Sequence, residues 1–196
     1  MSPWFGNYLG LSLLRLIILV EKAELRELGE SVAEGITRVL KVDPVIRWYR
    51  GPSPKAFFNT SRRQCRADKL MNAVIEEYRV SSSERLIAIL DQDAYVPGLN
   101  FVFGLARPGW GGLVFLSRLK PEFYGSPPSL PLLRSRVTKV SIHELGHSLG
   151  LGHCRNNLCV MRFDNTVYEV DVKTYRFCVR CVNELETLHP GLVRLY

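Results

Sequence analysis

Short apolar runs alternate with longer amphipathic segments through the first half of the chain. Runs dense in Leu, Ile and Val predict five strands, at residues 11–20, 45–49, 85–90, 100–105 and 112–116. Between the first three, apolar residues recur every three or four positions, which predicts helices at 23–40 and 62–78. Since strands and helices alternate at first and strands then follow one another, we expect a mixed sheet with helices packed on it.

The second half holds one long helical segment between two irregular regions. Residues 121–131 contain four prolines and a glycine, so we expect a loop there. A helix is predicted at 132–149. The last 43 residues, after His153, show little regular periodicity. No internal repeats are present, which excludes repeat architectures.

Length and composition are those of an ordinary globular domain. The chain has 196 residues, of which 46% are hydrophobic and 23% charged, so it can bury a core without disulfide bonds. Its formal net charge of +7 would permit nucleic-acid binding. However, the basic residues are spread along the sequence and no aromatic motif is interleaved with them. We therefore expect no nucleic-acid partner.

The most apolar stretch, residues 9–20, bears on location. It is too short to span a bilayer, is interrupted by Arg15, and lacks the basic start and cleavage site of a signal peptide. We expect no membrane association and a cytoplasmic location. In a reducing compartment, the five cysteines indicate metal binding before disulfide bonds.

The predicted helix at 132–149 carries a pattern of metal ligands beside a carboxylate. His143 and His147 lie four residues apart, so they fall on the same helix face and can converge on one ion. Glu144 lies beside that position, where its carboxylate can take a proton from a metal-bound water. These residues form the short pattern typical of zinc peptidases.

Residues just beyond this helix supply a third ligand. Gly150 stands where a helix can end in a left-handed conformation, and Gly152 gives the next turn similar freedom. The chain can then bring His153 back towards the first two histidines. Three neutral imidazoles and one open position for water are the arrangement expected of a catalytic zinc.

Four of the five cysteines follow the third histidine directly. Their spacing is Cys-x4-Cys, eighteen intervening residues, then Cys-x2-Cys, at Cys154, Cys159, Cys178 and Cys181. Two such thiolate pairs predict a closed tetrahedral structural zinc. A redox pair of Cys178 and Cys181 is the alternative, but it leaves the other two thiols unexplained. Because His153 and Cys154 are neighbours, we expect loss of the structural zinc to weaken catalytic zinc binding.

The combined pattern resembles a known group of metallopeptidases. The run from His143 to His153 is similar to the extended signature of the metzincin clan, His-Glu-x-x-His-x-x-Gly-x-x-His. The clan also has a methionine in a tight turn beneath the metal, and Met161 matches it as the only methionine after the motif. The continuation into Cys-x4-Cys-x-Met and Cys-x2-Cys resembles the archaemetzincin family, over residues 141–181.

The resemblance implies an α+β fold of the α/β/α type, zincin-like, with a mixed, mostly parallel twisted sheet and an active-site helix. It also implies one catalytic domain, 1–196, with an N-terminal subdomain at 1–153 and a small zinc-stabilised C-terminal subdomain at 154–196. Residues 101–106 would lie along the cleft and pair with an extended substrate, although an ordinary edge strand is an equal alternative. Phe163 stands where certain metzincins have a tyrosine, so the group that helps zinc to polarise the carbonyl stays unidentified.

We therefore expect a monomeric, zinc-dependent metallopeptidase, either an aminopeptidase or an endopeptidase, acting on a peptide or protein substrate. It would bind two zinc ions, with Glu144 as general base at the catalytic one. One alternative is a catalytically silent zinc-binding protein of zincin fold, which the intact Glu144 disfavours. Another is a nucleic-acid-binding module organised by the four-cysteine zinc. Outside these sites, we expect Cys65 to be a buried or idle thiol and His189 a surface turn residue.

Overall fold

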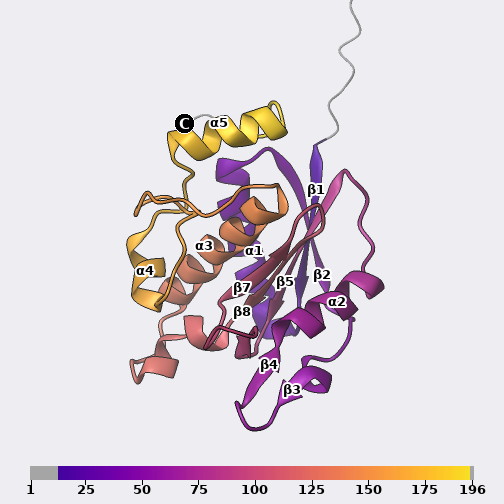
Figure 1. The fold of residues 1–196 in the computed structure, drawn as a ribbon, viewed down its shortest axis with the longest axis vertical. Helices are drawn as coiled ribbons and strands as arrows, with labels where there is room; N and C mark the ends of the chain where they lie inside the picture. Colours follow the sequence, from indigo (N-terminus) through magenta and orange to yellow (C-terminus); the bar gives the residue numbers. More distant parts are fainter. Residues whose placement is uncertain (1–12, 195–196) are drawn as a thin grey trace, which may run out of the picture.

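The apolar runs of the first half of the chain form a five-stranded sheet (Figure 1). In this computed structural model, which describes residues 13–194, the strand order is β2-β1-β5-β8-β7. The strands are β1 (Leu14–Val20), β2 (Val42–Trp48), β5 (Glu84–Leu90), β7 (Gly104–Arg107) and β8 (Gly111–Phe115). All neighbours are parallel except β7, which is antiparallel to β8 and forms one edge. The prediction of a mixed, mostly parallel sheet is confirmed.

Helices cover both faces of this sheet, which explains why its inner strands are almost wholly apolar. The α-helices are α1 (Arg26–Val39), α2 (Ala67–Glu77), α3 (Leu130–Ser148), α4 (Val167–Val172) and α5 (Val179–Leu188). Along β5, Ile87 and Ile89 face α1 and α3, whereas Leu86 and Ala88 face α2, as alternation along a strand requires. No helix within residues 13–194 has both the length and the apolar content needed to cross a membrane.

Some boundaries differ from those predicted because long-range pairing decides them. The strand expected at 100–105 begins only at Gly104, since the preceding residues turn towards Ala94 and the Val102 N–H donates to its carbonyl oxygen at 2.9 Å. The helix expected at 62–78 begins at Ala67, because the Cys65 N–H donates to Asp93. That pairing belongs to a small sheet of β3 (Phe58–Asn59), β4 (Gln64–Arg66) and β6 (Ala94–Tyr95).

The second half contains more helix than predicted. The expected loop at 121–131 includes a 3₁₀ turn, η4 (Pro121–Tyr124), and the start of α3, whose first turn accommodates Pro131 because that turn needs no N–H donor there. The cysteine-rich end forms α4 and α5, neither of which was predicted. A reciprocal cap between Thr166 and Glu169 starts α4, and this Thr-x-x-Glu signal is readable in the sequence. Positions 11–12 of the first predicted strand lie outside the described residues.

A candidate zinc centre and its cleft

The last two turns of α3 present the metal-binding pattern to a cleft of about 630 Å³. His143 and Glu144 are buried, and His147 is partly buried one turn later. Residues 98–106, which lead into and include most of β7, also line this cleft. This volume is within the range typical of ligand-binding sites in proteins.

A glycine turn then reverses the chain and delivers the third histidine. Gly150 has a φ of 102°, in the left-handed region that favours glycine. The N–H groups of Gly150 and Leu151 donate to carbonyl oxygens in the last turn of α3, both at 3.0 Å. Gly152 lies outside the left-handed region, so the freedom predicted for both glycines is used only at Gly150. The turn brings His153 back beside the helix.

The three imidazoles converge through the same ring nitrogen. The Nε2 atom of His147 lies 3.0 Å from that of His143 and 3.2 Å from that of His153. The Nδ1 atoms of His143 and His147 each lie 2.8 Å from a carbonyl oxygen, of Val160 and Leu151. Because a carbonyl only accepts, Nδ1 carries the proton in both rings, which leaves the Nε2 lone pairs free to face one point.

The electrostatics of these rings fit a zinc ion. Burial lowers the pKa of His143 well below its ordinary value, and it also lowers the pKa of His147 and His153. All three rings are therefore held in the neutral form that binds metal. Converging lone pairs repel one another unless a cation lies between them, so this donor set suits a zinc site with an open fourth position.

Glu144 lies in the wall of the cleft beside this centre. Burial raises its pKa to about 8, an effect opposed by the positive charge of Lys173. Within residues 13–194 no protein group donates a hydrogen bond to its carboxylate, and the side chain packs against strand backbone at Gly104 and Gly112. A carboxylate in this position can exchange protons with water in the cleft.

Met161 packs against the end of α3 that carries His143 and His147. Its side chain is fully buried, and a Cβ built on Gly146 would come within 2.4 Å of its Sδ. The residue before it, Val160, supplies the carbonyl that fixes the His143 ring. The methionine and its turn therefore form a floor on which the ligand-bearing end of α3 rests.

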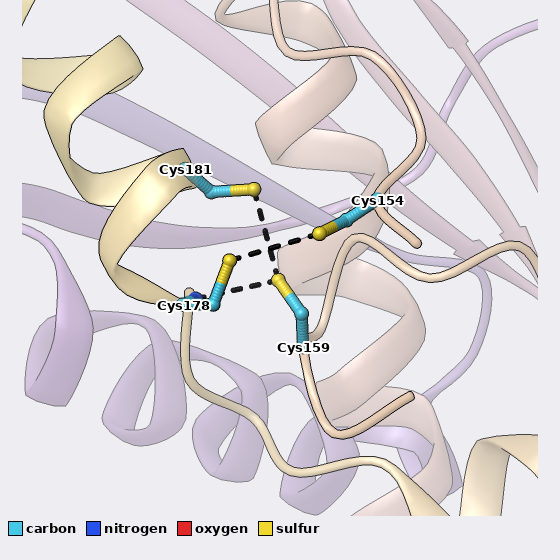
Figure 2. Close-up of side chains that lie close together, drawn as sticks. All are labelled: Cys154, Cys159, Cys178 and Cys181. Carbon is cyan, nitrogen blue, oxygen red and sulfur yellow. Dashed lines mark hydrogen bonds between the residues drawn. The ribbon is translucent and has the colours of Figure 1, made fainter. Parts of the chain in front are cut away.

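Four cysteines converge in a second cluster, shown in Figure 2. The thiols of Cys154, Cys159, Cys178 and Cys181 all lie within 4.8 Å of one another. The Sγ atoms of Cys154 and Cys178 are 3.6 Å apart, and those of Cys159 and Cys181 are 3.7 Å apart. Zn–S bonds of about 2.3 Å at tetrahedral angles place sulfurs about 3.8 Å apart. The cluster therefore has the dimensions of a four-thiolate zinc site, which a redox pair alone does not explain.

The two clusters share one short piece of chain. His153 and Cys154 are adjacent, and the Cys154 N–H donates to the Met161 carbonyl at 2.8 Å. Val160, whose carbonyl orients His143, is in turn adjacent to Cys159. The two clusters are thus connected through a short stretch of backbone.

A buried ion pair near the three histidines was not predicted from the sequence. Lys173 donates to the Asp164 carboxylate, and the two side chains are 0% and 6% exposed. Asp164 Oδ1 has no hydrogen-bond partner among the described residues. Burial lowers the pKa of Lys173 and raises that of Asp164, while each charge favours the other. No local signal marks this pair, because an exposed Asp and Lys nine positions apart would look the same in the sequence.

Replacing Lys173 with methionine should lower the free energy of unfolding by about 3–5 kcal/mol, since Asp164 would be left as an unpaired buried charge. Adding Asp164→Asn should recover much of that loss, and urea unfolding measures both changes. As a control, Glu30→Gln breaks an exposed pair with Arg26, whose side chains are 55% and 54% exposed, and should change stability by less than about 1 kcal/mol. Equal losses in the single and double variants would contradict a charge-balanced pair.

Other residues considered from the sequence have structural surroundings. His189 was expected in a surface turn, but its ring is partly buried and its Nε2 lies 2.9 Å from the Leu149 carbonyl oxygen, at the end of α3. That contact was not predictable because α5 carries His189 back to α3. Cys65 is buried outside both clusters, and its thiol donates to Pro54. The Phe163 ring lies edge-on to His153, with centroids 4.9 Å apart.

Comparisons with known proteins converge on one family. The sequence model described as Peptidase family M54 matches residues 23–187. An archaemetzincin of Saccharolobus islandicus is 43% identical over 141 residues, which are 72% of this chain and 76% of that protein. An archaemetzincin of Pyrococcus furiosus is 47% identical over 111 residues, 56% of this chain and 58% of that protein.

Solved structures agree with the sequence comparisons. The crystal structure of an archaemetzincin from Methanopyrus kandleri matches with a TM-score of 0.79 and 30% identity, over 93% of this chain and 98% of that one. The crystal structure of a zinc-dependent peptidase from Methanocorpusculum labreanum matches with a TM-score of 0.72 and 25% identity, over 87% and 99% of the two chains. The expected α+β architecture is thus confirmed over nearly the whole chain.

Proposed function

This chain belongs to peptidase family M54, the archaemetzincins, and is a zinc metallopeptidase; we propose that His143, His147 and His153 hold its catalytic zinc and that Glu144 is its general base. The observation that carries this proposal is the convergence of three neutral imidazole Nε2 atoms beside a buried carboxylate in the wall of the cleft. No other cluster of three or more candidate ligands within residues 13–194 faces that cleft.

The chemistry divides between the ion and the chain. When bound, zinc would act as a Lewis acid that lowers the pKa of a coordinated water to about 7 and polarises a carbonyl oxygen. The positive charges of Lys173 and of a bound zinc would oppose the effect of burial and favour the ionised form of Glu144. The carboxylate would then take one proton from the water as the water oxygen bonds to the scissile carbonyl carbon. When the C–N bond breaks, Glu144 returns that proton to the leaving nitrogen, so the carboxylate is regenerated. The cleft walls keep the peptide in place during both transfers.

The substrate is a peptide, and the shape of the cleft supports an extended one. β7 pairs with β8 along one side only, so its other side has backbone groups free to pair. Residues 101–106 line the cleft at this edge. We propose that the substrate adds to β7 as a further strand, through main-chain hydrogen bonds.

We further propose that the four cysteines hold a second, structural zinc. All four candidate ligands are sulfur and no position is left for water, as in closed structural sites. This cluster would organise a small C-terminal subdomain, 154–196, against an N-terminal subdomain, 1–153, within one catalytic domain. The cytoplasmic location and the monomeric state stay predictions.

Stepwise zinc removal tests the assignment of the two sites. Mass spectrometry should find two zinc equivalents per chain, and a chelator should remove the equivalent at the open histidine site first, because closed thiolate sites hold zinc harder. Peptide hydrolysis should fall at least about 100-fold with that first equivalent and return when zinc is added. His153→Ala should retain one equivalent and show no turnover. Activity that survives loss of the first equivalent would overturn the proposal.

A further inference from the structure

We infer that Gly104 and Gly112 position the Glu144 carboxylate for proton transfer, an inference that rests on the proposed function of Glu144. The two glycines lie on the neighbouring strands β7 and β8, both of which pack against α3. A Cβ built on Gly104 would lie 2.4 Å from Glu144 Oε1 and 2.6 Å from its Cδ and Cγ. One built on Gly112 would lie 2.7 Å from the Glu144 Cβ. The glutamate side chain therefore lies directly on strand backbone.

Glycine is needed at these two positions because a larger side chain would not fit, and not because of the backbone conformation. Neither Gly104 nor Gly112 has a φ in the left-handed region, in contrast to the neighbouring Gly111, whose φ is 149°. A glycine inside a strand weakens that strand, because its chain is more flexible when unfolded and it has no side chain to pack. An alanine would fit the backbone at either position. At both positions the side chain of Glu144 excludes it, and at Gly112 the Leu105 carbonyl oxygen is also close.

This contact matters because no hydrogen bond from a described residue fixes the carboxylate. Within the described part of the chain no group donates a hydrogen bond to it, and the side chain is buried. Its position is therefore set by the walls around it, of which Gly104 contacts the carboxylate end and Gly112 the base of the side chain. A methyl group at Gly104 would displace the carboxylate, because the end of the Glu144 side chain moves more easily than the strand backbone on which it lies. A displacement of about 1 Å can slow a reaction on the order of 100-fold.

Gly104 offers the cleaner test of the two. A Cβ at Gly112 would also come within 3.3 Å of the Leu105 carbonyl oxygen, which would disturb the pairing of β7 with β8. At Gly104 the three nearest atoms all belong to Glu144. Gly104→Ala should therefore change the position of the Glu144 side chain and little else.

The experiment is a double-mutant cycle between Gly104→Ala and Glu144→Ala, read by kinetics, zinc content and thermal unfolding. Gly104→Ala alone should lower kcat about 10- to 100-fold, with KM within about twofold of wild type and both zinc equivalents retained. It should also lower the unfolding midpoint. In the Glu144→Ala background the atoms that clash are gone. There the same alanine should leave the unfolding midpoint unchanged or raise it.

Each arm of the cycle has an outcome that overturns the inference. A kcat within twofold of wild type in Gly104→Ala would do so, as would an equal loss of midpoint in both backgrounds. If Gly104→Ala fails to fold, the double variant should fold, and failure of both would count against the inference. Full activity in Glu144→Ala would instead reject the proposed general base. The unfolding midpoints would still report whether Gly104 and Glu144 are coupled.

Discussion

Replacing Glu144 with glutamine should lower kcat/KM for peptide hydrolysis by about 10²- to 10⁴-fold, while two zinc equivalents stay bound. Glutamine has nearly the same volume, so it fits against Gly104 and Gly112 as glutamate does. Its amide cannot take a proton from water or return one to the leaving nitrogen. The loss corresponds to about 3–5 kcal/mol of transition-state stabilisation. Steady-state kinetics on a peptide library, with zinc counted by mass spectrometry in the same samples, measures it.

A matched control separates this effect from a general change of charge. Glu122 is exposed in η4 and does not line the cleft, so Glu122→Gln removes the same charge away from the centre. That variant should hydrolyse peptides at the wild-type rate. If Glu144→Gln also does so with zinc occupancy unchanged, Glu144 is not the base. If the chain is instead a catalytically silent zinc-binding protein, the wild type, Glu144→Gln and Glu122→Gln should all show no turnover.

The candidate site was predictable because its ligands are encoded locally. His143 and His147 fall on one face of a helix by their spacing alone, and Gly150 marks the turn that returns His153. The two cysteines within each pair are also close in sequence. The two pairs meet because the chain between them folds back through α4. Motif spacing thus predicted which side chains converge more accurately than periodicity predicted the boundaries of the strands.

Features that depend on contacts between distant elements were not predictable. The need for glycine at position 104 comes from a side chain on α3, forty residues later in the sequence. Burial of Lys173 likewise follows from the packing of the C-terminal segment, since lysine is ordinarily exposed. The late start of β7 depends on the pairing of Val102 with Ala94. In each case the local sequence is compatible with several structures, and a contact with a residue distant in the sequence determines which one forms.

Loss of the proposed structural zinc should weaken zinc binding at the histidines, so Cys178→Ser is expected to affect both proposed metal sites. With one thiolate fewer, the cysteine cluster should lose its zinc, since a serine hydroxyl is a poor replacement for a thiolate. The freed chain includes Val160, whose carbonyl orients the His143 ring, and Cys154, which is adjacent to His153. Disturbing groups that orient a metal ligand typically lowers affinity about 10- to 100-fold. Competition with a chelator of known affinity would measure this change.

The comparison variant is Cys65→Ala, because Cys65 is also buried but lies outside the cluster. It should keep both zinc equivalents and wild-type affinity at the histidines, which would show that removing a buried thiol is not sufficient to weaken the site. Full occupancy and unchanged affinity at the histidines in Cys178→Ser would rule out coupling between the two sites. A loss at both sites in Cys178→Ser, but at neither in Cys65→Ala, is expected if the four-thiolate site holds the segment that shapes the catalytic centre. In that case kcat/KM of Cys178→Ser should recover when excess zinc refills the histidine site, to the extent that Val160 and His153 regain their positions.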